Sequence, residues 1–257
     1  MTLQKYLGRF TLSSSATDFV VGGVSSVALT EGRYYMAGYT GESTLQLCEH
    51  MQTEIRAIGA PYGSTTVTLS STTGLVTIAV LGAVTAIDWT HTALRDLLGF
   101  TANLSGAASY TATNKARYCW FPSRGLVEYP GDLTEWWAKR STSYGYRSPD
   151  GVTYSTQGTL IKEGKFKYSH LPKADVISVS DTVWETFQEF WTDVIHAGEP
   201  FRCFPDRTLN GSGDIKVATF GSLDDDPVGS FTDYMDRNIR SYNGLWTVEM
   251  FLWEYLS

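Results

Sequence analysis

The sequence predicts an α+β fold in which a small antiparallel sheet with helices precedes a larger β-rich part that carries one flanking helix. Two observations support this prediction. Short segments alternate apolar with polar residues, as half-buried strands do. Other segments repeat apolar residues every three or four positions, as amphipathic helices do. In the first part the elements follow the order strand, helix, strand, strand, helix, which suggests a compact unit with an antiparallel sheet.

Residues 1–125 form a predicted first domain that is rich in Thr, Ser, Gly and Ala. A helix is expected at Ser43–Ile58, where apolar residues keep helical spacing and Gly59 follows. A shorter helix is expected at Thr92–Leu98, before Gly99. Strands are expected at Arg9–Ser13, Phe19–Leu29, Arg33–Tyr39, Thr65–Ser70, Gly74–Leu81 and Thr85–Trp89.

Residues 126–150 form a predicted aromatic linker or loop. The stretch Arg117–Asp150 is rich in Tyr, Trp, Pro and Arg, and it is interpreted as a loop or extended crossover with a short helix at Asp132–Lys139. Long loops in compact proteins tend to be functional or to act as linkers.

Residues 151–257 are predicted to form a β-sandwich or barrel with one flanking helix. Strands are expected at Gly151–Lys167, Asp175–Val179, Phe201–Phe204, Ile215–Phe220, Ser230–Asp236 and Gly244–Tyr255. The last strand has two apolar faces: Trp246, Val248, Met250 and Leu252 on one, and Leu245, Phe251, Trp253 and Tyr255 on the other. Such a strand is either central between layers or covered by a neighbouring subunit.

The flanking helix is predicted at residues 181–197. Thr182 and Glu185 have the spacing of a capping box at its start, and Gly198 suits the position after its end. Its apolar stripe consists of Val183, Trp184, Phe187, Phe190, Trp191, Val194 and Ile195. The stripe holds large aromatic side chains and no catalytic residue type, so the helix is interpreted as a packing element.

Charge and cysteine content narrow the possible functions. The formal net charge of −7 opposes a general nucleic-acid-binding role, which needs clustered Lys and Arg. Cys48, Cys119 and Cys203 are far apart and form no CxxC motif, so free buried thiols and synthesis in a reducing cytosol are expected. No secretory signal is recognised, and the apolar run Val76–Ile87 is too short to span a bilayer.

No catalytic, cofactor or metal site is predicted. The acidic run Asp224-Asp225-Asp226 is interpreted as a solvated loop, because neighbouring carboxylates diverge. The segment from Asp206 to Asp214 lacks the spacing and the terminal Glu of a calcium loop. The histidines lack metal-ligand spacing, and neither a G-x-S-x-G elbow nor a phosphate-binding loop is present. The chain is therefore predicted not to be an enzyme.

Aromatic residues are the candidate functional residues. Trp and Tyr are enriched at subunit interfaces, which is the preferred interpretation here, with an ordinary core and a sugar-binding platform as alternatives. The predicted interface residues are Trp120, Tyr129, Trp136, Trp137, Tyr144, Tyr146, Phe251, Trp253 and Tyr255.

Two segments resemble viral structural proteins. The Trp/Phe helix with HAGEPFRCFPD at His196–Asp206, together with YNGLWTVEMFLWEY at Tyr242–Tyr255, resembles the tail-tube and distal-tail (baseplate) proteins of tailed bacteriophages. The segment Gly74–Phe100, an alternating strand, a short helix and Leu-Gly-Phe, resembles a pattern of viral structural proteins.

The resemblance implies a tail-tube-like β-sandwich whose subunits join through sheet edges and extended loops into a ring, commonly a hexamer. It also implies cytoplasmic synthesis, location in the virion tail, no cofactor and no membrane. The implied partners are other tail proteins such as tube, hub and tape measure. DNA would pass the ring without specific binding, since an acidic channel does not hold phosphate. Asp224, Asp225 and Asp226 are candidates for lining such a channel.

Alternative functions stay open at this point. The ring could be another tail ring, such as tube, terminator or neck. A carbohydrate-binding module for a host receptor would use Trp136 and Trp137. A polysaccharide hydrolase would need a carboxylate pair, for which Glu128, Asp132 and Glu135 are available.

Overall fold

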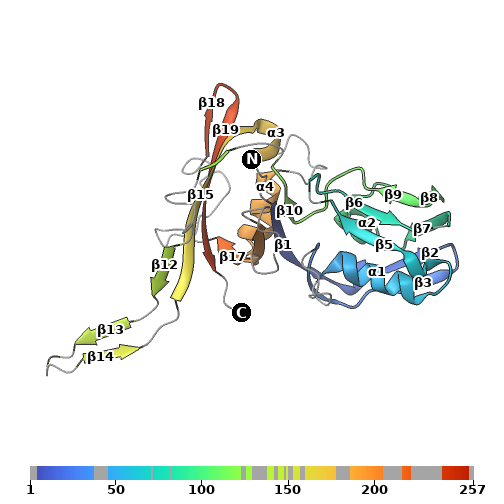
Figure 1. Cartoon of the computed structure of the whole chain (residues 1–257), viewed down its shortest axis with the longest axis horizontal. Helices are drawn as coiled ribbons and strands as arrows, with labels where there is room; N and C mark the ends of the chain where they lie inside the picture. Colours follow the sequence, from blue (N-terminus) through green and yellow to red (C-terminus); the bar gives the residue numbers. More distant parts are fainter. Residues whose placement is uncertain are drawn as a thin grey trace.

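The computed structural model describes residues 5–37, 46–70, 72–81, 83–122, 126–128, 138–141, 144–147, 149, 153–156, 160–177, 186–204, 216–220 and 239–254. These residues form a mixed helix and sheet structure in which all paired strands are antiparallel, in agreement with the predicted α+β class (Figure 1). Two lobes and a projecting hairpin are visible, and the lobes correspond to two separate hydrophobic clusters.

The first lobe contains two small sheets. One has the order β3-β2-β7-β8, with bounds Asp18–Val21 for β2, Ser25–Ala28 for β3, Thr85–Trp89 for β7 and Leu104–Ala107 for β8. The other has the order β5-β6-β9, with bounds Thr66–Leu69, Val76–Ala79 and Ser109–Thr111. Among the described residues, the lobe also contains two α-helices, α1 (Leu47–Ala57) and α2 (Thr92–Leu97), and two 3-10 turns, η1 (Ser14–Ala16) and η3 (Tyr62–Ser64).

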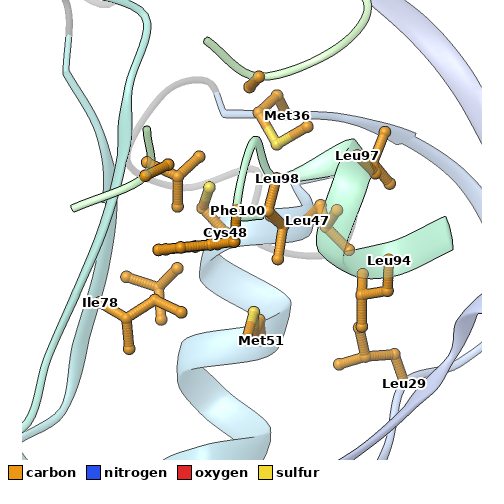
Figure 2. Packing of buried hydrophobic residues seen from close by; sticks show 14 of the residues in the cluster. Leu29, Met36, Leu47, Cys48, Met51, Ile78, Leu94, Leu97, Leu98 and Phe100 are labelled. Atoms are coloured by element: carbon orange, nitrogen blue, oxygen red, sulfur yellow. The ribbon is translucent and has the colours of Figure 1, made fainter. Parts of the chain in front are cut away.

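Helices α1 and α2 bury their apolar faces between these sheets. Figure 2 shows Cys48 and Met51 of α1 in one cluster with Leu94 and Leu97 of α2 and with Phe100. All of these side chains are at most 7% exposed. The helical spacing predicted from the sequence is therefore confirmed as a core-facing stripe.

Helix α1 begins later than predicted and protects a sheet edge. Gln46 is extended (φ −122°) and bridges Tyr35, so the helix starts at Leu47 and not at Ser43. At the edge strand β5, the amide of Val67 donates to Oε1 of Gln52 at 3.1 Å, and Nε of Arg56 donates to the carbonyl of Thr65 at 2.7 Å. Covering an edge in this way prevents pairing with a foreign strand.

The second lobe is built on one large antiparallel sheet with the order β10-β1-β16-β17-β19-β15-β11, with β4 on β1, β12 on β15 and β18 on β19. The bounds are Lys5–Leu12 (β1), Gly32–Tyr35 (β4), Cys119–Trp120 (β10), Leu126–Glu128 (β11), Ala138–Ser141 (β12), Leu160–Pro172 (β15), Phe201–Phe204 (β16), Lys216–Phe220 (β17), Ile239–Tyr242 (β18) and Leu245–Glu254 (β19). The flanking helical segments are α3 (Lys173–Val176), α4 (Phe187–Phe190) and the π-helix η4 (Trp191–Ile195).

Strand β1 belongs to both lobes. Its first half, Lys5–Gly8, pairs with β16, and its second half, Arg9–Leu12, pairs with β4. Apolar side chains from Leu7 to Phe121 fill the first cluster, and those from Trp120 to Met250 fill the second. The predicted domain boundary at residue 125 lies outside the described residues.

The predicted flanking helix is present between Phe187 and Ile195, and its capping box is formed by Thr186 and Glu189. The pair Thr182 and Glu185 lies outside the described residues. Phe187, Phe190, Trp191 and Val194 are buried, so the predicted stripe does face the core. The helix widens at its end, where the amide of His196 donates to the carbonyl of Trp191, and Gly198 has a φ of +71°.

Four predictions about local structure are wrong. The predicted strand Gly151–Lys167 is divided between β14 (Thr153–Thr156) and β15, which belong to different sheets. The segment predicted as the strand Asp175–Val179 begins with helix α3, because Pro172 is extended at the N-cap and Lys173-Ala174-Asp175 turn after it. The predicted helix Asp132–Lys139 ends in a strand, since Ala138–Ser141 pairs with β15; residues 129–137 lie outside the described part. The predicted strand Phe19–Leu29 is a hairpin of β2 and β3 that turns at Gly22-Gly23.

Candidate assembly surfaces

The predicted interface residues divide into three groups. Trp120 is fully described and fully buried. Tyr144 and Tyr146 lie on a hairpin strand, and Phe251 and Trp253 lie on β19. For these four residues the structure describes the backbone path alone. Tyr129, Trp136, Trp137 and Tyr255 lie outside the described residues.

Trp120 packs inside the second lobe. Its ring lies 5.2 Å from that of Tyr168 and 4.8 Å from that of Phe187, and its Nε1 donates to the carbonyl of Asp175 at 3.0 Å. With 0% exposure the side chain offers no surface to another subunit. The alternative interpretation of an ordinary core residue therefore holds for Trp120.

The last strand, β19, is central in its sheet, where it pairs with β15, β17 and β18. Val248 and Met250 are fully buried on the side that faces α3 and α4, so one predicted apolar face is part of the core. Phe251 stands opposite Lys165 and Trp253 opposite Glu163 in the backbone register with β15.

A projecting arm is the most prominent surface feature. Strand β15 runs out of the lobe with β12 paired to its first residues, from Ser141 opposite Leu160 to Ala138 opposite Glu163. Beyond them lies a hairpin of β13 (Tyr144–Arg147) and β14 (Thr153–Thr156). Figure 1 shows this hairpin standing away from both lobes. Among the described strands, β13 and β14 pair only with each other.

The sequence predicted β12 and β13 as part of a linker or loop, and β14 with the start of β15 as one strand, Gly151–Lys167. The signal for the hairpin was present but weak, because Tyr144, Tyr146 and Tyr154 alternate with small or polar residues and Tyr146 stands opposite Tyr154. β-branched and aromatic residues at alternate positions are typical of strands. An isolated two-stranded hairpin is at best marginally stable in water, so a hairpin of this kind fits a contact with another chain.

The junction between the lobes is held by two ion pairs that sequence analysis did not predict. Nε of Arg9 donates to Glu199 at 2.8 Å. Arg117 donates to Asp193 through Nε at 2.9 Å and through a terminal nitrogen at 3.3 Å. Burial alone would lower the pKa of Arg117, but the hydrogen bond and the negative charge of Asp193 outweigh it and raise the pKa. Arg117 is therefore a permanent cation in this pair.

A buried cation also joins the lobes. The guanidinium of Arg202 lies 4.2 Å from the ring centre of Tyr35, and both side chains are at most 5% exposed. Stacking of a desolvated arginine on an aromatic face is favourable. Together with the two ion pairs, this contact makes the junction a fixed structural element rather than an open cleft.

Among the described residues, no group of three or more His, Cys, Asp and Glu side chains could hold a metal ion. His50 accepts a hydrogen bond from the amide of Thr30 at 3.0 Å, and His196 stacks on Trp191 at 5.0 Å. The acidic run at Asp224–Asp226 and the segment from Asp206 to Asp214 lie outside the described residues.

No helix among the described residues is long and apolar enough to cross a membrane. No protein-family model, curated protein sequence or solved structure matches this chain.

Proposed function

We propose that this chain is a structural subunit of a bacteriophage tail that forms an oligomeric ring at the distal tail or baseplate. The observation that carries the proposal is the arm: a hairpin, β13–β14, that pairs with no third strand in the described chain and projects from a large antiparallel sheet. An arm of this type can make a head-to-tail contact, in which each copy binds a different surface of a neighbour that is rotated about the ring axis.

The second lobe supplies the matching architecture. Its sheet carries the helix pair α4 and η4 on one face, and its central strand β19 has apolar residues on both faces. This arrangement fits a tail-tube-like sandwich in which a neighbouring subunit covers the outer face. In this proposal the first lobe is a peripheral addition to the ring-forming part.

The charge of the chain suits a channel for DNA. With a formal net charge of −7, a ring of identical copies would repel phosphate and let DNA pass without adhering. The proposed location is the virion tail, with other tail proteins as neighbours. The protein is proposed to act without cofactor and without catalysis.

The test is the absolute mass of the purified protein by light scattering over a concentration series. A closed ring or a polymer is expected for the wild-type chain. A shortened-arm variant should lose this association. In it, residues 142–159 are replaced by Asn-Gly, because Ser141 and Leu160 are directly opposite and a two-residue turn can join them.

A control keeps the arm and changes a distant exposed turn, with Thr72→Ala between β5 and β6. Circular dichroism and thermal unfolding establish that both variants are folded. A wild-type chain that stays monomeric at every concentration, or a shortened-arm variant that associates as the wild type does, would contradict the proposal. Binding on a glycan array that depends on Trp136 and Trp137 would instead favour the carbohydrate-binding alternative.

A further inference from the structure

The first lobe exposes a group of apolar side chains at one place. Four large apolar residues are exposed in the described part of the chain: Val24 at 87%, Leu81 at 65%, Val84 at 70% and Tyr242 at 81%. The first three lie on the β2–β3 and β6–β7 turns of the first lobe, whereas Tyr242 is the last residue of β18 in the second. Single exposed apolar residues are ordinary, but a cluster indicates a contact.

Hydrogen bonds bring these turns together. Strand β2 pairs with β7 up to Val21 opposite Ile87, and the amide of Gly22 continues the ladder by donating to the carbonyl of Ala86 at 2.8 Å. The β2–β3 turn therefore lies beside the β6–β7 turn. The hydroxyl of Ser64 donates to the carbonyl of Leu81 at 3.3 Å, which adds η3 to the same end of the lobe. Val24, Leu81 and Val84 are called the apolar tip below.

The surface next to the tip is uncharged. The amide of Val80 donates to the carbonyl of Ala108, so strand β9 starts beside the tip. On the sheet β5-β6-β9, the inward residues Val67, Val76 and Ile78 are buried. The outward face consists of two registered rows of small residues: Thr68, Thr77 and Thr111, and Thr66, Ala79 and Ser109. The tip and these rows together are called the neutral surface.

The absence of charge extends along the sequence segments that build this surface. No Asp, Glu, Lys or Arg occurs between Asp18 and Glu31, between Arg56 and Asp88, or between Asp96 and Lys115, although charged residues make up 18% of the chain. Arg56 itself is turned to the carbonyl of Thr65 at the protected edge of β5. The neutral surface is thus an apolar tip beside hydroxyl-bearing rows.

We propose that the neutral surface binds the same surface of a second copy of this chain. Two copies that each carry a formal net charge of −7 repel each other, and the repulsion is smallest where neither presents a charge. A basic partner would gain no electrostatic attraction from this surface and would bind an acidic surface of the chain instead. A patch that meets its own copy makes an isologous contact related by a two-fold axis.

The contact is separate from the arm. Figure 1 places the first lobe and the β13–β14 hairpin at opposite ends of the long axis of the molecule. Stable interfaces bury about 800 Å² on each partner, and three apolar side chains with two short rows form a smaller patch. The contact is therefore weak alone, and it becomes effective when two rings meet face to face, because several two-fold-related copies of it then form together.

The test is sedimentation velocity of the full chain over a concentration series, with two charged variants of the tip. Leu81→Asp with Val84→Asp, and Leu81→Lys with Val84→Lys, each place like charges opposite each other across a two-fold contact. Each double variant should weaken self-association by at least about tenfold. An equimolar mixture of the two should restore it, because unlike charges then meet. Both positions are exposed, so the substitutions should leave the fold intact, and circular dichroism verifies this.

The control is Tyr242→Asp, which adds the same charge at the exposed apolar residue of the other lobe and should leave association unchanged. Raising the salt concentration from about 0.05 M to 0.5 M should strengthen the wild-type contact, because salt screens the overall repulsion. Association that is unaffected by either tip variant, or that the mixture fails to restore, would overturn the proposal. So would a wild-type tip that binds vesicles of phosphatidylcholine and not a second copy.

The tip variants and the shortened-arm variant separate the two proposals. If only the shortened-arm variant loses association, the result supports the proposed ring and rejects the neutral surface as a contact. If only the tip variants lose association, the result supports the neutral surface as a contact and rejects the arm as the ring-forming element.

Discussion

Gly8→Ala is expected to destabilise the junction between the lobes through steric overlap. A Cβ at this position would lie 2.8 Å from Cγ1 of Val194, closer still to its Cγ2, and 3.1 Å from the carbonyl oxygen of Tyr118. Carbon atoms in contact prefer about 3.5–4.0 Å. The backbone of Gly8 is in a conformation that other residues adopt, so the effect arises from packing alone.

Neither neighbour can move aside. Val194 is 0% exposed within the second cluster, and the carbonyl of Tyr118 accepts the amide of Gly8 at 2.7 Å. Overpacking of a well-packed core costs about 1–3 kcal/mol. Because two heavy atoms overlap the added methyl and the third contact is backbone, we expect Gly8→Ala to lower the free energy of unfolding by about 2–3 kcal/mol.

The measurement is urea unfolding followed by tryptophan fluorescence, with a double-mutant cycle. Val194→Ala removes both overlapping methyl groups and alone should cost about 2 kcal/mol. The double variant should then be more stable than the sum of the single effects by at least about 1 kcal/mol. Gly32→Ala is the matched control, since a Cβ there would lie 3.4 Å from the ring of Tyr34, in ordinary contact.

Two results would refute this reasoning. One is an equal effect of Gly8→Ala and Gly32→Ala. The other is strict additivity of Gly8→Ala with Val194→Ala, which would mean that the two side chains do not compete for the same space.

Three further predictions use the same unfolding measurement. Thr186→Ala removes the capping box with Glu189 and should cost about 1 kcal/mol, whereas Thr186→Ser should cost little; equal losses would contradict the capping role. Arg117→Met breaks the pair with Asp193 and should cost about 1 kcal/mol, less at high salt; no salt dependence would argue against an ionic contribution. Burial, and secondarily the charge of Glu49, raises the pKa of the Cys48 thiol from 9.0 to about 12. Because the thiol ionises more easily in the unfolded chain, its contribution to the free energy of unfolding is complete below pH 9.0. Between pH 9.0 and about 12 this contribution declines by up to about 1.4 kcal/mol per pH unit. Cys48→Ala should reduce that decline. If the variant shows the same pH dependence of the free energy of unfolding as the wild type, Cys48 is not its cause.

Local signals in the sequence predicted local structure well. Strand β7 occupies Thr85–Trp89 as predicted, because the buried Ile87 and Trp89 alternate with the less buried Ala86 and Asp88. Gly59 and Gly99 follow the ends of α1 and α2 and have φ values of +91° and +84°, which favour glycine. A Cβ at Gly99 would also overlap the carbonyl of Asn114.

Features that depend on remote partners could not be predicted in this way. Nothing in Lys5–Leu12 indicates that its two halves pair with β16 and β4, because strand pairing carries no local signature. Trp120 has the composition of an interface residue, and only its contacts with Tyr168 and Phe187 reveal it as core. The apolar tip likewise exists because two turns from distant segments meet.

The path of β1 affects the order in which the chain can fold during synthesis. Arg9 meets Glu199 across a sequence separation of 190 residues, and Gly8 pairs with Phe201. The first cluster uses residues up to Phe121 and can condense while the ribosome still makes the rest. The first half of β1 must wait with an unpaired edge until β16 emerges, which makes this pairing a late and slow step. A nascent chain stalled before Phe201 would therefore present an open strand edge to the quality-control machinery of the cell.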